Sequence, residues 1–154
     1  MIPEKVRQVL ASNALQAIEF EAGSTPTAVM AAERLGVSVG QIAKSLLFRA
    51  KNGSLYLVVC AGDRKVTNSK LKNAIGVKTR MTTVDETFEA TGFAPGAVCP
   101  FGVEGLEILI DESLAQFDTV YPAAGTDASG VPMSFDDLCR ITRGRRCSVS
   151  DLRS

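Results

Sequence analysis

The sequence contains no histidine and no tryptophan among its 154 residues. Without histidine, Ser-His-Asp and Cys-His catalytic sites are excluded, so any catalysis must use lysine, aspartate, backbone amides, bound water or the substrate itself. The cysteines Cys60, Cys99, Cys139 and Cys147 show no CxxC spacing. The usual zinc sites are therefore difficult to assemble, and we expect neither a metal nor a cofactor. We interpret Cys60 and Cys139 as small buried side chains.

Long apolar runs are also missing. No stretch approaches the roughly 20 apolar residues that cross a bilayer, and residues 1–7 lack the hydrophobic region of a signal peptide. We therefore expect a cytoplasmic protein without membrane contact. The length and the 45% hydrophobic content favour one domain over residues 1–154 with a substantial core.

The formal net charge is zero, because 17 lysines and arginines balance 17 acidic residues. This balance argues against a DNA-binding protein held by broad phosphate neutralisation. The charges are nevertheless unevenly placed: residues 64–80 carry six basic side chains, residues 81–118 carry eight acids and no base, and four arginines cluster in residues 140–146. Two interpretations stay open for the basic clusters, a solvated surface or contact with a polyanion.

Short helical and strand patterns alternate along the chain. Asn52-Gly53 between two apolar runs predicts a β-hairpin. Asn68, Thr83 and Ser134 are expected to begin helices. This order favours a mixed sheet or partly closed barrel with peripheral short helices over a doubly wound parallel fold. The expected strands cover residues 17–20, 42–49, 54–61, 106–111 and 119–124, and the expected helices cover 4–13, 28–35, 68–74, 83–90 and a last segment from 134.

Lys44 lies in an otherwise apolar strand pattern, residues 42–48. Strand alternation places it on the same face as Ile42, Leu46 and Phe48. A buried, unpaired ammonium has a lowered pKa or costs several kcal/mol. The strand therefore frays at Lys44, pairs it with a carboxylate, or opens it to a cavity; the alternative is a lysine reaching solvent from an edge strand.

A glycine-rich loop follows in residues 91–105 and contains the pattern GxxxP from Gly96 to Pro100. Such a loop can direct successive backbone N–H groups at one point, where a carbonyl oxygen becomes an oxyanion. A further segment, residues 121–130, ends a strand in small and polar residues, among which Asp127 and Ser129 are candidate site residues. Ordinary structural turns are the alternative for both segments.

With these segments in order, the chain resembles the YbaK/prolyl-tRNA synthetase-associated editing family, which includes freestanding relatives of the domain inserted in bacterial prolyl-tRNA synthetases. The resemblance covers nearly the whole chain. It rests on the lysine strand at residues 42–48, on residues 62–66 with Leu71, on the GxxxP loop within residues 91–102, and on the late glycine segment at residues 123–126.

The resemblance implies an α+β domain with a mixed, curved, partly barrel-like sheet and peripheral short helices. It also implies an aminoacyl-tRNA deacylase, which hydrolyses the ester joining a wrong amino acid to the 3′ end of a tRNA. Lys44 would hold the terminal nucleotide or its ester, and the backbone of Gly96, Ala97, Val98, Cys99 and Pro100 would surround the ester carbonyl. Candidate substrate-binding residues are Phe20, Met30, Ser45, Gly125, Thr126, Asp127 and Ser129.

Many family members carry a histidine or another polar residue just beyond the late glycine, where this chain has Asp127, Ala128 and Ser129. This departure bears on which amino acid is removed. We expect a small one, Ala, Ser, Cys or Thr, with tRNA for proline as a candidate carrier, because a synthetase pocket discriminates one methylene by only about 1 to 3 kcal/mol. The expected partners are the acceptor end of aminoacyl-tRNA and a synthetase. The alternatives are a noncatalytic module that binds a tRNA end or a synthetase, and a hydrolase of another small ester or amide.

Overall fold

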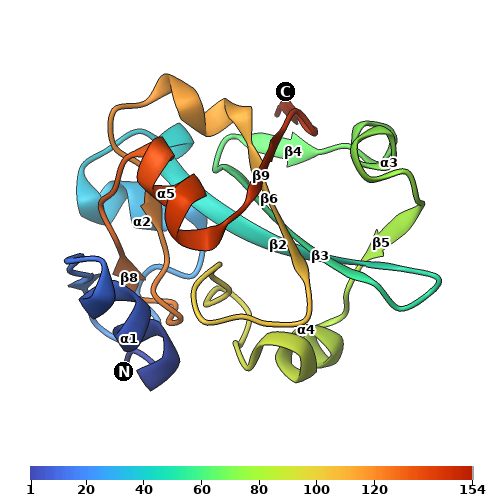
Figure 1. Cartoon of the computed structure of the whole chain (residues 1–154). Helices are drawn as coiled ribbons and strands as arrows, with labels where there is room; N and C mark the ends of the chain where they lie inside the picture. The colour runs from blue at the N-terminus through green and yellow to red at the C-terminus, as the bar shows by residue number, and fades with distance from the viewer. Residues whose placement is uncertain (154) are drawn as a thin grey trace.

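A mixed six-stranded sheet forms the centre of the computed structural model, which describes residues 1–153 (Figure 1). β2 pairs antiparallel with β3 and β5, whereas β3–β6, β6–β9 and β2–β7 are parallel pairs. The strands are β2 (Ile42–Ala50), β3 (Leu55–Ala61), β5 (Thr79–Met81), β6 (Glu107–Asp111), β7 (Tyr121–Pro122) and β9 (Arg145–Cys147).

The longest pairing in the sheet is the β2–β3 hairpin, which confirms the prediction from Asn52-Gly53. Gly53 has φ +90°, a left-handed conformation that glycine adopts without a steric penalty. The Asn52 side chain accepts the Ser54 N–H at 2.9 Å and closes the turn. The register places Lys44 opposite Cys60.

Five short helices surround the sheet (Figure 1). Thr83 caps the fourth and Ser134 caps the fifth, as the sequence predicts, and Glu86 completes a capping box with Thr83. The prediction for Asn68 is wrong by one residue, since the N-cap there is Thr67 and its hydroxyl makes no capping bond. The helices are α1 (Glu4–Ser12), α2 (Ala28–Leu35), α3 (Asn68–Ile75), α4 (Val84–Thr91) and α5 (Phe135–Thr142).

The core lies on both faces of the sheet, because alternate residues of β3 point to opposite sides. Val59 and Ala61 belong to the larger cluster, together with residues of α1, α5 and the glycine-rich loop. Val58 and Cys60 belong to a second cluster with Leu71 of α3. Cys60 is fully buried as expected, whereas Cys139 is only half-buried.

Two small strand pairs stand beside the main sheet. They are β1 (Ile18–Glu19) with β8 (Ser129–Gly130), and β4 (Arg64–Val66) with β10 (Ser150–Leu152). The architecture confirms the α+β class with a mixed sheet and peripheral short helices, and the strands of residues 1–153 form no closed barrel. Within this range, none of the helices combines the length and apolar composition needed to span a bilayer.

Candidate active site

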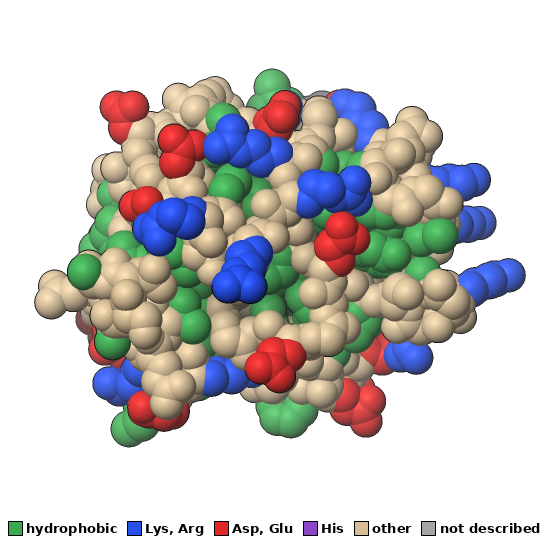
Figure 2. All heavy atoms as spheres, viewed as in Figure 1, with side chains coloured by type: hydrophobic (Ala, Val, Ile, Leu, Met, Phe, Trp, Pro, Cys, Tyr) green, Lys and Arg blue, Asp and Glu red, His purple; other side chains and the backbone are tan. Residues whose placement is uncertain are grey.

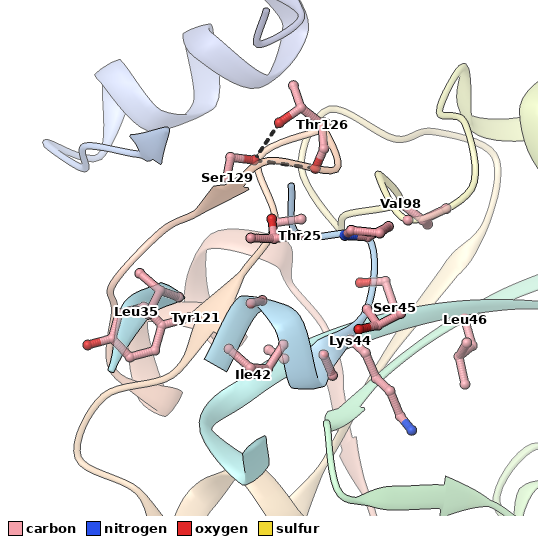
Figure 3. A pocket seen from close by; sticks show the side chains of 17 residues that line it. Thr25, Leu35, Ile42, Lys44, Ser45, Leu46, Val98, Tyr121, Thr126 and Ser129 are labelled. Atoms are coloured by element: carbon pink, nitrogen blue, oxygen red, sulfur yellow. Dashed lines mark hydrogen bonds between the residues drawn. The ribbon is translucent and has the colours of Figure 1, made fainter. Parts of the chain in front are cut away.

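A cavity of about 270 Å³ lies between α2, the middle of β2, the glycine-rich loop and the late glycine segment (Figure 3). Drug-sized ligands occupy pockets of about 300 to 1,000 Å³, so this cavity suits a smaller group. Its walls come from four segments far apart in the sequence. They are Thr25, Pro26, Thr27, Ala28, Ala31 and Leu35; Ile42, Ala43, Lys44, Ser45 and Leu46; Gly96 and Val98; and Tyr121, Ala123, Thr126 and Ser129.

Ser45 presents a hydroxyl to this cavity from β2. Figure 3 shows its side chain on the side of the strand where Thr25 and Val98 lie. The oxygen is buried and has no hydrogen-bond partner within residues 1–153. An unsatisfied buried hydroxyl costs about 1 to 3 kcal/mol, so this oxygen is available to a ligand that supplies the missing bond.

Lys44 borders the same cavity, but its ammonium lies on the other face of β2 (Figure 3). There it donates a hydrogen bond to the backbone carbonyl oxygen of Arg64, which begins β4. This orientation corrects the expectation that the Lys44 ammonium holds the ester in the same cavity as the backbone of residues 96–100. The reason is strand alternation, which directs Ser45 rather than its neighbour toward the cavity.

The environment of the Lys44 ammonium is partly buried and mixed in charge. Burial lowers the pKa of Lys44, and the positive charge of Arg153 lowers it further, whereas the negative charge of Asp63 opposes both effects. The amine is thus easier to neutralise than an ordinary lysine, while its hydrogen bond to the Arg64 carbonyl connects β2 with β4.

The glycine-rich loop closes one side of the cavity at Gly96. With φ +79°, Gly96 lies so near the segment that leads into α2 that an added Cβ would be 3.1 Å from the carbonyl oxygen of Pro26. Ala97 donates its N–H to Ala94 at 3.0 Å inside the loop's own turn. The N–H groups of Gly96 and Val98 have no acceptor in the described part of the chain. Both residues line the cavity, so their amides are candidate donors to a ligand.

A network of hydrogen bonds connects the late glycine segment and the residues after it with Gly23 and Thr25, which precede α2. The Ser129 hydroxyl accepts the Ala124 N–H at 3.0 Å and lies 2.8 Å from the Thr126 hydroxyl. The Asp127 carbonyl accepts both the N–H and the hydroxyl of Thr25, while its carboxylate accepts the Gly23 N–H at 3.1 Å. Asp127 thus acts as a structural link behind the cavity wall.

Cys99 does not face the cavity. It is fully buried, and its sulfur points to the Phe101 carbonyl oxygen at 3.8 Å. Burial raises the pKa of the Cys99 thiol to about 12, so the side chain remains a neutral thiol at physiological pH. Nucleophilic catalysis needs the thiolate, which this environment disfavours.

The structure brings together some of the predicted site residues and leaves others apart. Phe20 packs beneath the Arg34 guanidinium, and Met30 is 39% exposed on α2. Those that line the cavity are Lys44, Ser45, Gly96, Val98, Thr126 and Ser129; those that do not are Phe20, Met30, Ala97, Cys99, Pro100, Gly125 and Asp127.

The lining residues of α2 were not expected from the sequence. Ala28, Ala31 and Leu35 have the i, i+3, i+7 spacing of any amphipathic helix. That spacing indicates a buried face but does not distinguish a cavity wall from ordinary core packing. Tyr121 lies in the expected site segment of residues 121–130, but it was not among the candidate side chains named there.

Comparison with known proteins gives the family. Residues 22–141 match the sequence model described as an aminoacyl-tRNA editing domain. The chain belongs to this family. The cavity of the editing domain therefore lies within the matched range, because all of its lining residues fall between Thr25 and Ser129.

Relatives of this editing domain occur alone and within synthetases. The uncharacterized protein YwhH of Bacillus subtilis (strain 168) is 43% identical over 125 residues, which cover 80% of this chain and 79% of YwhH. The proline--tRNA ligase of Desulforamulus reducens (strain ATCC BAA-1160 / DSM 100696 / MI-1) is 33% identical over 148 residues. That match covers 87% of this chain but only 26% of the ligase.

A solved structure with the same fold is described as "a putative trans-editing enzyme for prolyl tRNA synthetase". It superposes with a TM-score of 0.87 at 30% sequence identity and covers 98% of this chain and 99% of its own. The fold is therefore shared over nearly the full length of both chains.

Proposed function

We propose that this editing domain is an aminoacyl-tRNA deacylase that removes a small amino acid, Ala, Ser, Cys or Thr, from the 3′ end of a tRNA, with tRNA for proline as its carrier. The observation that carries the proposal is the cavity, whose size suits a small acyl group and whose walls contain a buried, unpartnered Ser45 hydroxyl together with Gly96 and Val98, whose N–H groups have no acceptor within residues 1–153. The family and the synthetase relatives support the tRNA ester as the substrate class.

The reaction is hydrolysis of an ester. A water oxygen attacks the carbonyl carbon, the bond to the ribose oxygen breaks, and the proton released by water is taken up by that ribose oxygen. Free amino acid and a tRNA with its terminal hydroxyl restored are the products. The chain contains no histidine, and an ester is already activated, so stabilisation of the oxyanion is the main task left to the protein.

The Gly96 and Val98 amides suit this task because their N–H groups have no acceptor within residues 1–153. Loss of one such donor typically lowers the rate about 10²- to 10³-fold, so a site built from backbone can supply much of the catalysis. The Ser45 hydroxyl would orient the ester or the attacking water from the opposite wall. The small side chains of Ala28 and Ala31 would leave room for the amino acid.

Lys44 is proposed to hold the terminal nucleotide, for which its ammonium has to leave the face of β2 turned away from Ser45 and swing toward the cavity. The lysine stem is long and flexible, so its ammonium can exchange the Arg64 carbonyl for a nucleotide oxygen when the substrate arrives. In the absence of substrate, the same bond keeps β2 against β4 and so maintains the position of Ser45.

A deacylation panel tests the proposal. The protein is incubated with tRNA for proline charged with Ala, Ser, Cys, Thr or proline, and the half-life of each ester is measured. We expect the protein to shorten the half-life of the ester for at least one small amino acid and to leave the half-life of the prolyl ester unchanged. If all half-lives are unchanged or lengthened, the protein is not a deacylase, and the result favours a noncatalytic binding module. Equal turnover of a small ester without the tRNA body would indicate a more general hydrolase.

A further inference from the structure

A second cavity of about 240 Å³ adjoins the first one. The two cavities share Ser45, Leu46, Gly96 and Val98, so these residues of β2 and the glycine-rich loop form the boundary between them. The remaining walls of the second cavity come from β2, the β5–α4 region and Pro95, and they are Leu47, Met81, Thr82, Val84, Thr87 and Pro95. The cavity system thus extends from the candidate active site toward β5 and α4.

Four cations lie at the far end of this path, and we call them the cationic rim: Arg49, Lys51, Lys78 and Arg80. They line a hollow of about 700 Å³ between the tip of the β2–β3 hairpin and β5. All four are exposed. Figure 2 shows lysine and arginine side chains gathered at the right-hand edge of the molecule, the side on which the hairpin tip and β5 lie in Figure 1.

The rim and the candidate active site use the same face of β2. Arg49 is directly opposite Arg80 in the β2–β5 ladder, so their side chains share one face. Because alternate residues of a strand share a face, that face also carries Ser45 and Leu47. Four residues of strand at about 3.3 Å each place Arg49 roughly 13 Å from Ser45. An extended polymer strand can therefore reach from the rim to the cavity along β2.

The charge of the rim is only partly compensated within the protein. Glu86 lies 2.8 Å from Arg80 and 3.5 Å from Arg49, so one acid serves both arginines. Lys51 and Lys78 form no ion pair with any other residue of the described chain. Like charges placed together are destabilising, and a partner that carries several negative charges would relieve this repulsion.

The other basic clusters lack this combination. Arg140, Arg145 and Arg146 each pair with an acid of their own, and Arg143, which forms no ion pair within residues 1–153, lies in a hollow lined by β3 and β6 and not by β2. Lys70, beside β4, pairs with Asp151. The Lys44 ammonium also lies near β4, on the face of β2 that is turned away from Ser45. Only the rim combines uncompensated charge with the cavity face of β2 among these clusters.

We infer that the cationic rim binds the phosphates of the tRNA acceptor strand, whose terminal nucleotides cross the second cavity to bring the ester to the first. The inference rests on the proposed function, since it names how the substrate of that same site is held. A groove lined by exposed lysine and arginine side chains suits the phosphate backbone of a nucleic acid, and such contacts do not depend on base sequence.

The test measures the affinity for an RNA hairpin that carries an acceptor stem and its single-stranded 3′ end but no amino acid. The affinity is measured by fluorescence anisotropy at several salt concentrations. The rim variant is K51Q/K78Q, and the matched control is R140Q/R146Q, which removes two exposed charges from α5 and β9. We expect the rim variant to bind several times more weakly than wild type and to lower the salt slope, log K against log [salt], by about 1 to 2. The control should keep the wild-type slope.

A rim variant with the wild-type affinity and slope would overturn the inference, as would a control that loses as much as the rim variant. Because the RNA carries no aminoacyl ester, the measured affinity does not depend on hydrolysis. A wild-type protein whose RNA binding depends on the rim but which cleaves no ester would refute the deacylase and leave the rim in place. If esters are cleaved, the rim variant should raise KM with little change in kcat, since phosphate contacts bind substrate and transition state alike.

Discussion

Gly96 lies close to Pro26 in the wall of the candidate active site. A Cβ atom added to Gly96 would lie 3.1 Å from the Pro26 carbonyl oxygen and 3.3 Å from its Cα. The two residues are 70 positions apart in the sequence, so only the fold brings the glycine-rich loop against the segment that leads into α2. This contact sets the distance between the free amides of the loop and the small side chains of α2.

Substitution of Gly96 tests the importance of this contact. In G96A, the side chain is strained at φ +79° and also meets Pro26, so we expect a loss of stability and at least a tenfold loss of deacylation. The matched control is G105A, because Gly105 has φ +73° with nothing within 4 Å of the added Cβ. Urea unfolding and single-turnover deacylation measure both effects. Wild-type activity in G96A would show that the loop position is not critical.

The Ser45 hydroxyl should matter for activity, and its removal should not destabilise the fold. Because its oxygen has no partner within residues 1–153, S45A loses no internal hydrogen bond and removes an unsatisfied buried hydroxyl, so we expect its unfolding free energy to equal that of wild type or to exceed it by up to about 1 to 3 kcal/mol. Deacylation should fall roughly 10- to 100-fold if the hydroxyl contacts the ester or the water. S24A is the control, since the Ser24 oxygen is also buried and unpartnered but does not line the cavity. Equal activities of S45A and S24A would contradict the assigned role.

Replacement of Lys44 by alanine should abolish deacylation and leave the fold intact. Circular dichroism and thermal unfolding monitor the fold, and the ester half-life on mischarged tRNA monitors activity. The matched variant K44R keeps the charge but changes the shape of the donor group, so it should retain part of the activity if the charge holds a nucleotide. Full activity of K44A would refute a role for the amine in the reaction.

The lowered pKa of Lys44 has a consequence for stability. The native state binds the proton less tightly than the unfolded chain, whose lysine has a pKa of 10.5. The unfolded state therefore holds more protons between the lowered pKa and 10.5, and the unfolding free energy rises with pH in that window. We expect wild type to gain stability relative to K44M as the pH rises from 7 toward 10.5. Urea unfolding of both proteins along this range measures the difference, and a constant difference would contradict the lowered pKa.

Thiol alkylation tests the assignment of Cys99 to the core. Its burial and its pKa near 12 predict that iodoacetamide does not label it in the native protein at pH 8. Cys139 is half-buried and should be labelled first. Mass spectrometry of peptides after timed labelling locates the modified residue. Rapid labelling of Cys99, with loss of deacylation, would place that thiol in the site after all.

Local features of this chain followed from the sequence because a few neighbouring residues determine them. Asn52 and Gly53 close their own turn, and Thr83 and Glu86 cap their own helix. The lysine strand, residues 62–66 with Leu71, the GxxxP loop and the late glycine segment, in this order, indicated the editing family, which the match over residues 22–141 confirms. The short strands β4, β5, β9 and β10 were missed, since three residues show no period and pair only because a distant partner is present.

Only the tertiary structure decided which side of β2 faces the ligand. Alternation fixes that Lys44 and Ser45 point in opposite directions, but it does not tell which direction contains the cavity. That depends on Gly96, Pro26 and Thr126, which approach Ser45 from three other segments of the chain. Contacts between such distant residues arise from packing of the whole sheet and its helices, and no local pattern encodes them.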